Sequence, residues 1–155
     1  MFLRGEEMTK FVEIMDRLQI QPAGIDLTVR EIERIVEPGE IDFTNKMRRI
    51  PKGEKIEFEE KVELEPGAYR IRYRELVEVP RDCIGILLPR SSLLRMGATI
   101  FGALWDPGYR GRGQGLMLVF NPYGIILHRN ARVAQLTFIK GKLTEGYKGT
   151  YQNEQ

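Results

Sequence analysis

The chain has 155 residues, a length that suits one domain with a closed core and leaves little for a second. Its 24 basic and 22 acidic residues nearly balance, so no bulk positive field predicts binding to nucleic acid or to an anionic membrane. One cysteine and one histidine exclude an internal disulfide and argue against a zinc site, and no apolar run is long enough for a membrane span. We therefore expect one cytoplasmic domain over residues 1–155, with neither a membrane nor a nucleic-acid partner.

The N-terminal segment has the spacing of an amphipathic helix. Phe11, Ile14, Met15 and Leu18 fall at positions i, i+3, i+4 and i+7, so the pattern predicts one helix over residues 6–18. It is the only substantial helix that we expect in the chain.

The rest of the chain has the pattern of short β-strands. Apolar and polar residues alternate in IQPAGIDLTV (20–29), KIEFEEKVEL (55–64) and YRIRYRELVEV (69–79). Apolar runs bounded by Pro, Gly or Asn follow at 84–88, 98–104, 116–120 and 124–128, and RVAQLTFIK (132–140) alternates again. Strands at this spacing, with no helical pattern between them, predict an all-β sandwich or barrel-like fold.

From Gly141 onward the chain has several glycines and few aliphatic residues. This segment, GKLTEGYKGTYQNEQ, predicts a flexible lid over residues 141–155 that closes over a site. Its two tyrosines, Tyr147 and Tyr151, are candidate substrate contacts.

The strongest local motif is PRSSLLR (89–95), which directly follows an apolar strand. Arg90 and Arg95 supply guanidinium groups, and Ser91 and Ser92 add hydroxyl and backbone N–H donors, so the segment is able to grip phosphate oxygens. The alternative is a strand end that carries solvated arginines.

The segment WDPGYRG (105–111) predicts a turn, because Asp-Pro-Gly favours a turn with or without a function. Asp106 is the only acid between Asp82 and Glu145, and in sequence it lies among four arginines. Near a bound triphosphate, such a carboxylate is placed to act as a general base on water. Tyr109 is either a core aromatic or a plate on which a sugar ring stacks.

Two polar residues lie within predicted strands. Gln135 is in the middle of the last strand, where its amide either has structural hydrogen bonds or contacts a ligand. Asp26, in AGIDL, is either a turn acid or part of the water shell of a metal ion. The residues alone leave both alternatives open.

Together these segments resemble the superfamily of deoxyuridine triphosphatases and deoxycytidine triphosphate deaminases. The resemblance is carried by IQPAGIDL, PRSSL, LWDPGYRG and RNARVAQLTF, four motifs in the family's order. The opening stretch and the ending GYKGTYQNEQ are more similar to the deaminase branch and its archaeal relatives. The resemblance implies a distorted jelly roll of β-strands, a homotrimer with sites between subunits, and a deoxynucleoside triphosphate bound with Mg²⁺.

The same resemblance implies roles for individual residues. Asp106 matches the acid that orients the attacking water, and Tyr109 matches the aromatic beneath the deoxyribose. Asp26 matches the acid that holds magnesium through water. The phosphate contacts match Arg90, Ser91, Ser92, Arg95 and Gln135.

The strand after DPGYRG distinguishes the two activities. The resemblance to the deaminases implies a glutamate on this strand, which moves a proton between water and the leaving ammonia. RGQGLMLVF has no carboxylate, and the amide of Gln114 has no proton to exchange near neutral pH. We therefore expect hydrolysis of dUTP to dUMP and pyrophosphate. The alternatives are a dCTP deaminase, including one that also hydrolyses its product, and a β-trimer that binds nucleotides without turnover.

Two glycines in this strand are also unusual. Gly113 and Gly115 interrupt it and predict either a bulge or the close approach of another group.

Overall fold

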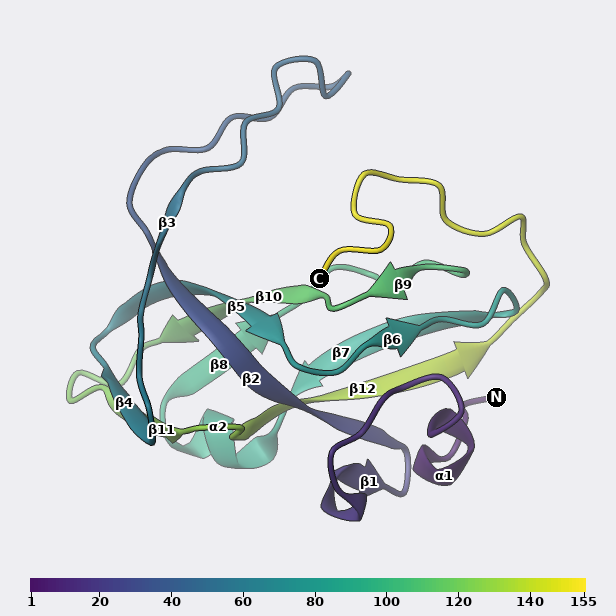
Figure 1. Cartoon of the computed structure of the whole chain (residues 1–155), viewed down its shortest axis with the longest axis horizontal. Coiled ribbons are helices and arrows are strands. Elements are labelled where there is room, and N and C mark those ends of the chain that lie inside the picture. The colour runs from purple at the N-terminus through teal and green to yellow at the C-terminus, as the bar shows by residue number, and fades with distance from the viewer.

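The computed structural model describes all of residues 1–155. Its largest element is an antiparallel sheet crossed by the long strand β2 (Gly24–Ile35) (Figure 1). The strand order is β7-β12-β2-β5-β10-β8, with β7 (Cys83–Pro89), β12 (Arg132–Lys140), β5 (Gly67–Tyr73), β10 (Gln114–Val119) and β8 (Ala98–Phe101). Because β8 also packs beside β7, the sheet is nearly closed into a barrel. The predicted all-β, barrel-like fold is confirmed.

The remaining strands form short ribbons and extensions of β2. β4 pairs with β11 and β6 pairs with β9, while β1 and β3 pair with β2. These strands are β1 (Ile20–Gln21), β3 (Gly53–Lys55), β4 (Lys61–Leu64), β6 (Val77–Glu78), β9 (Arg110–Gly111) and β11 (Ile125–His128). The helical elements are α1 (Gly5–Met8), the 3-10 turn η1 (Arg17–Gln19) and α2 (Ser91–Arg95).

Alternation along the strands places one set of side chains inside the barrel. On β12, Ala134, Leu136 and Phe138 are fully buried, whereas Gln135 and Thr137 between them are partly exposed. Each large apolar side chain removed from water stabilises the fold by about 1.5–3 kcal/mol. The period-2 pattern in the sequence therefore determines which face of each strand becomes core.

The helix predicted over 6–18 is wrong beyond its first turn, since α1 ends at Met8. The backbone of Phe11 accepts from Glu78 at 2.7 Å, and Val12 forms an antiparallel bridge with Val77 of β6. Pairing with β6 buries Val12 in an extended chain, and Phe11 and Ile14 pack against the core without a helix. Leu18, which the helix would have buried, is 70% exposed.

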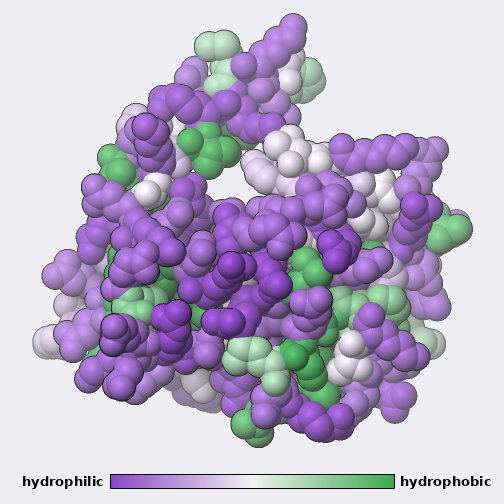
Figure 2. Space-filling model, in the orientation of Figure 1, coloured by the Kyte–Doolittle hydropathy of each residue, from purple (hydrophilic) through white to green (hydrophobic).

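The strand predicted over 55–64 is shorter than expected, because its partner changes along the way. Ile56 still donates its N–H to Ile32 of β2 at 2.9 Å, but the chain then leaves β2 and pairs with β11 only from Lys61 onward. Before β3, residues 36–52 project from the body of the molecule, and we call them the arm (Figure 1). An opening separates the arm from the body in the space-filling view (Figure 2).

Candidate functional site

The predicted site residues fall into two groups in the chain. The first, which we call the arginine-serine cluster, lies where β7 leads into α2 and comprises Asp26, Arg90, Ser91, Ser92, Arg95 and Gln135. The second, which we call the tyrosine pocket, is a hollow of about 630 Å³ that includes Asp106, Tyr109, Tyr147 and Tyr151. No residue of the arginine-serine cluster lines the tyrosine pocket.

The arginine-serine cluster is built around a buried carboxylate. Arg90 precedes α2 in an extended conformation, and its backbone N–H donates to Val133 of β12 at 3.0 Å. Its Nε lies 3.1 Å from Oδ2 of Asp26, and Nη1 of Arg132 lies 3.3 Å from the same oxygen. Burial raises the pKa of Asp26, and the two guanidiniums limit that rise. The carboxylate thus orients Arg90 beside the exposed start of α2.

The other members of this cluster surround the same strand ends. Ser91 and Ser92 are exposed at the start of α2, and Arg95 is exposed at its end. Gln135 is paired directly with Asp26 on β2 and with Leu88 on β7, so these three side chains share one face of the sheet. The fold therefore gathers hydroxyls, an amide and a guanidinium that are dispersed in sequence, as a phosphate site requires.

The tyrosine pocket begins at a tight turn. Trp105 pairs with Gly85 of β7 through two backbone hydrogen bonds of 2.8 and 3.0 Å, which fixes the start of the turn. The N–H of Tyr109 then donates to the carbonyl of Asp106 at 3.1 Å, and Gly108 between them has φ +77°. Proline followed by a residue with positive φ is the geometry of a type II turn, which favours glycine. The turn leaves the carboxylate of Asp106 exposed at the pocket.

Aromatic rings form one side of the pocket. The Tyr109 ring lies edge-on to Trp105 with centroids 5.3 Å apart, and edge-on to Tyr147 with centroids 5.8 Å apart. Tyr147 is held by its own N–H, which donates to Pro107 at 2.6 Å, and its hydroxyl accepts from the N–H of Tyr151 at 3.3 Å. The tail thus places both predicted tyrosines at the pocket, whereas their contact with substrate stays a prediction.

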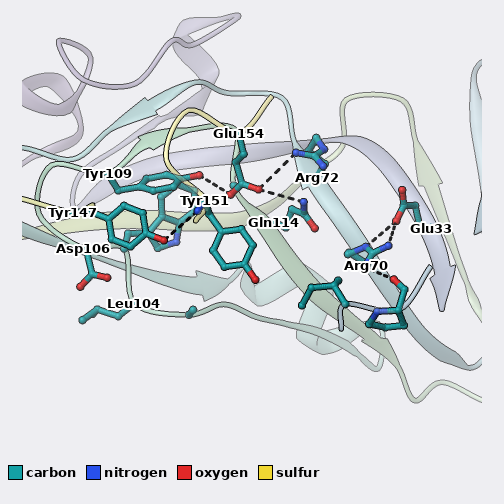
Figure 3. Close-up of a pocket in the computed structure, with 15 residues that line it drawn as sticks. Glu33, Arg70, Arg72, Leu104, Asp106, Tyr109, Gln114, Tyr147, Tyr151 and Glu154 are labelled. Atoms are coloured by element: carbon teal, nitrogen blue, oxygen red, sulfur yellow. Dashed lines mark hydrogen bonds and ion pairs between the residues drawn. The ribbon is translucent and has the colours of Figure 1, made fainter. Parts of the chain in front are cut away.

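Charged side chains form the opposite side (Figure 3). Arg70 donates to Glu33 through Nε and Nη2, at 2.7 and 2.5 Å, and to the carbonyl of Pro51 at 3.1 Å. The hydroxyl of Tyr109 donates to Glu154 at 2.8 Å, and the amide of Gln114 donates to the same carboxylate at 3.3 Å. Burial, and next the hydrogen bond to Glu154, raise the pKa of the Tyr109 hydroxyl, so it remains a donor at neutral pH.

The two glycines in the strand after the turn make room for rings. A Cβ on Gly113 would lie 2.5 Å from the Trp105 ring, and one on Gly115 would lie 2.2 Å from the hydroxyl of Tyr73. The predicted close approach is confirmed, and it lets the Trp105 ring pack against the backbone at Gly113, just before β10.

Several pocket residues were not predicted. Arg70 and Arg72 alternate with the buried residues of β5, a signal for an exposed face but not for a pocket. Glu154 lies within the predicted lid but was not among the candidate contacts there, and the ion pair of Arg70 with Glu33 joins β5 to β2, which are far apart in sequence. Glu75 was also missed: it is 1% exposed, and it accepts hydrogen bonds from Gln19 and Thr28.

The chain has no preformed set of side-chain ligands for a metal ion. No group of three or more His, Cys, Asp or Glu side chains could hold one, and Oδ2 of the predicted ligand Asp26 is already paired with two arginines. None of the helices is long and apolar enough to span a membrane.

Comparison with known proteins identifies the family. A family model described as dCTP deaminase-like matches residues 4–141. A protein of Aeropyrum pernix named "Probable deoxyuridine 5'-triphosphate nucleotidohydrolase" is 46% identical over 159 residues, covering 99% of each chain. One of Methanocaldococcus jannaschii, named "Deoxyuridine 5'-triphosphate nucleotidohydrolase", is 39% identical over 156 residues, covering 98% of this chain and 99% of its own.

A solved structure supports the fold. The dCTP deaminase of Agrobacterium tumefaciens superposes with a TM-score of 0.67 over 90% of this chain, at 19% identity. The match spans 48% of that longer chain, about half its length. The solved structure supports the fold alone, whereas the family model over residues 4–141 and the two relatives show that this chain belongs to the dCTP deaminase-like family.

Proposed function

We propose that the protein hydrolyses dUTP to dUMP and pyrophosphate. The observation that carries the proposal is the exposed carboxylate of Asp106, presented by a rigid turn at the edge of an aromatic pocket. A volume of about 630 Å³ is enough for a nucleoside. The names of the two archaeal relatives, which match this chain over nearly their whole length, agree with this substrate.

The chemistry needs one base and a grip on phosphate. Asp106 takes a proton from water as the water oxygen bonds to the α-phosphorus of dUTP. The bond from that phosphorus to the bridging oxygen breaks, and its electron pair leaves with pyrophosphate. Arg90, Ser91, Ser92 and Gln135 bind the triphosphate oxygens and stabilise the charge that develops on them, and Arg95 at the end of α2 extends this grip.

The two groups form one site only if different subunits supply them. In one chain the arginine-serine cluster lies outside the tyrosine pocket, so we propose that the cluster of one subunit meets the pocket of its neighbour in a homotrimer. Exposed apolar side chains support such an interface. Phe101 of β8 and Leu116 of β10 are paired and are 56% and 38% exposed, and Phe120 nearby is 67% exposed.

Magnesium fits this scheme as part of the substrate. Since the chain lacks a cluster of carboxylates for a resident ion, we propose that Mg²⁺ enters bound to the triphosphate. In that case Asp26 acts mainly by orienting Arg90, and its role toward the waters of the ion stays a prediction.

One observation favours a second candidate, dCTP deamination. β10 carries no carboxylate, but Glu154 from the tail lies 2.8 Å from the hydroxyl of Tyr109, inside the pocket. A carboxylate there is a possible proton carrier for attack of water at C4 of cytosine. Deamination would release ammonia and leave the triphosphate intact, so the products distinguish the two reactions.

The test is to incubate the protein with dUTP, dCTP or dTTP and Mg²⁺ and to measure pyrophosphate and ammonia separately. We expect pyrophosphate from dUTP and no ammonia from dCTP. Asp106→Asn should abolish release, whereas Glu57→Gln, on the exposed surface beside Lys55, should behave as the wild type. Ammonia from dCTP at a rate comparable with hydrolysis of dUTP would establish the second candidate instead, and no turnover of any nucleotide would indicate a binding protein.

A further inference from the structure

The carboxylate of Glu154 is held inside the tyrosine pocket by two hydrogen bonds and an ion pair (Figure 3). Tyr109 donates to Oε1 at 2.8 Å, Gln114 donates to Oε2 at 3.3 Å, and the guanidinium of Arg72 lies 3.8 Å from Oε2. The Glu154 side chain is only 19% exposed. Acidic side chains normally remain in water, whereas this one occupies a site with two hydrogen-bond donors and a guanidinium from three separate segments of the chain.

The backbone of the tail is docked as well. Asn153 donates to the carbonyl of Arg110 at 2.6 Å, and Arg112 donates to the carbonyl of Glu154 at 2.8 Å. The amide of Gln152 donates to Gly108 at 3.0 Å and accepts from the N–H of Arg110 at 2.9 Å. The tail therefore lies beside β9 and the turn that carries Asp106 (Figure 1). This docking places the side chain of Glu154 in the pocket (Figure 3).

We propose that Glu154 is an internal ligand of the tyrosine pocket and competes with the nucleoside half of the substrate. The inference rests on the proposed function, in which that half enters this pocket. The donors of Tyr109, Gln114 and Arg72 are suited to acceptor oxygens, and the carbonyl and sugar oxygens of a pyrimidine nucleoside are such acceptors. A nucleoside bound to these donors must displace the two carboxylate oxygens.

The competition is confined to one half of the substrate. The proposed phosphate contacts around Arg90 lie outside the pocket, and Glu154 touches none of them. Removal of the Glu154 carboxylate should therefore strengthen the binding of a nucleoside and leave the binding of pyrophosphate unchanged. The apparent affinity rises because a larger fraction of the protein has a vacant pocket.

The chain provides both a probe and a control. Trp105 is the only tryptophan, and it lines the pocket 5.3 Å from the Tyr109 ring, so its fluorescence reports occupation of the pocket. Glu145 is a second tail glutamate, 90% exposed and paired only with Lys148. Glu145→Ala removes the same charge from the tail without changing the pocket.

The experiment titrates the intact protein with deoxyuridine, followed by Trp105 fluorescence and confirmed by calorimetry, and separately with Mg²⁺-pyrophosphate, followed by calorimetry alone because its proposed contacts lie outside the pocket. For Glu154→Ala we expect the Kd for deoxyuridine to fall about three- to tenfold, the effect of losing charge-assisted hydrogen bonds that hold the pocket closed. We expect no change in the Kd for pyrophosphate, and no change in either Kd for Glu145→Ala.

Other outcomes would overturn the inference. A Kd for deoxyuridine that is unchanged or weaker in Glu154→Ala, or no binding of deoxyuridine to either protein, would show that Glu154 does not compete. An equal fall for Glu145→Ala would assign the effect to tail charge in general. The proposed function is judged separately, because it fails only if the wild type releases no pyrophosphate from dUTP.

Discussion

Mixing two inactive variants should restore activity if the site is shared between subunits. Arg90→Ala removes the phosphate grip from the arginine-serine cluster, and Asp106→Asn removes the base from the tyrosine pocket. Arg132 still pairs with Asp26 in the first variant, so that carboxylate is not left alone. The loss of a general base costs about 10²- to 10⁴-fold in rate, so Asp106→Asn alone should be nearly inactive. Arg90→Ala loses a charge-assisted contact to phosphate, so at dUTP concentrations below its weakened Kd it should also turn over little substrate.

The recovered activity follows from counting sites. In a randomly mixed equimolar trimer, each site has one chance in two of an intact cluster and one in two of an intact pocket. About a quarter of the sites are therefore whole, and the mixture should show about a quarter of the wild-type rate. If both groups came from the same subunit, no mixture would contain a whole site.

The assay is release of pyrophosphate from dUTP after the two variants are unfolded together and refolded. Mass spectrometry of the intact assemblies confirms that subunits have mixed, and the double variant mixed with itself is the control. Mixed assemblies with no recovered activity would refute a shared site. So would light scattering that shows a fully active monomer.

Three further predictions concern the tail-independent parts of the fold and the catalytic residues. Gly115→Ala should lower the free energy of unfolding by about 1–3 kcal/mol in chemical denaturation, because the new Cβ meets the buried hydroxyl of Tyr73. Adding Tyr73→Phe should recover most of this loss. Equal losses with and without the Tyr73 hydroxyl would contradict the clash. Burial raises the pKa of Glu75 above its ordinary value of 4.5. The contribution of Glu75 to stability is therefore full below pH 4.5 and is lost as the pH rises through the folded-state pKa, so the unfolding free energy of the wild type should fall with rising pH relative to that of Glu75→Gln. Parallel pH profiles of the two proteins would contradict this prediction. In steady-state kinetics Asp106→Asn should reduce kcat while dUTP binding measured by calorimetry persists, whereas Arg90→Ala should weaken that binding; near-normal turnover of Asp106→Asn would assign the base to another residue.

The strands were predictable where one face of the sheet is buried along its whole length. Ala134, Leu136 and Phe138 alternate with polar residues because β12 lies between two other strands with one face in the core. The N-terminal segment was not predictable by the same rule. Phe11 and Ile14 satisfy a helical period, but the backbone of β6 offers partners that no local pattern reveals.

Some parts of the candidate site were likewise predictable from the sequence, and others were not. PRSSL and WDPGYRG were recognisable because their chemistry is local: a strand end followed by a short helix, and a turn that needs Pro and Gly. The charged side of the pocket was not recognisable, because Arg72, Gln114 and Glu154 come from three separate segments. Only folding brings them together, and each is an ordinary surface residue in sequence.

The position of bond cleavage in dUTP tests the central claim most directly. The reaction is run with Mg²⁺ in water enriched in a heavy oxygen isotope, and both products are weighed by mass spectrometry. Attack on the α-phosphorus by a water that Asp106 activates predicts one heavy oxygen in dUMP and none in pyrophosphate. Label in pyrophosphate would place the attack on another phosphorus, and unlabelled dUTP remaining after prolonged incubation would contradict hydrolysis altogether.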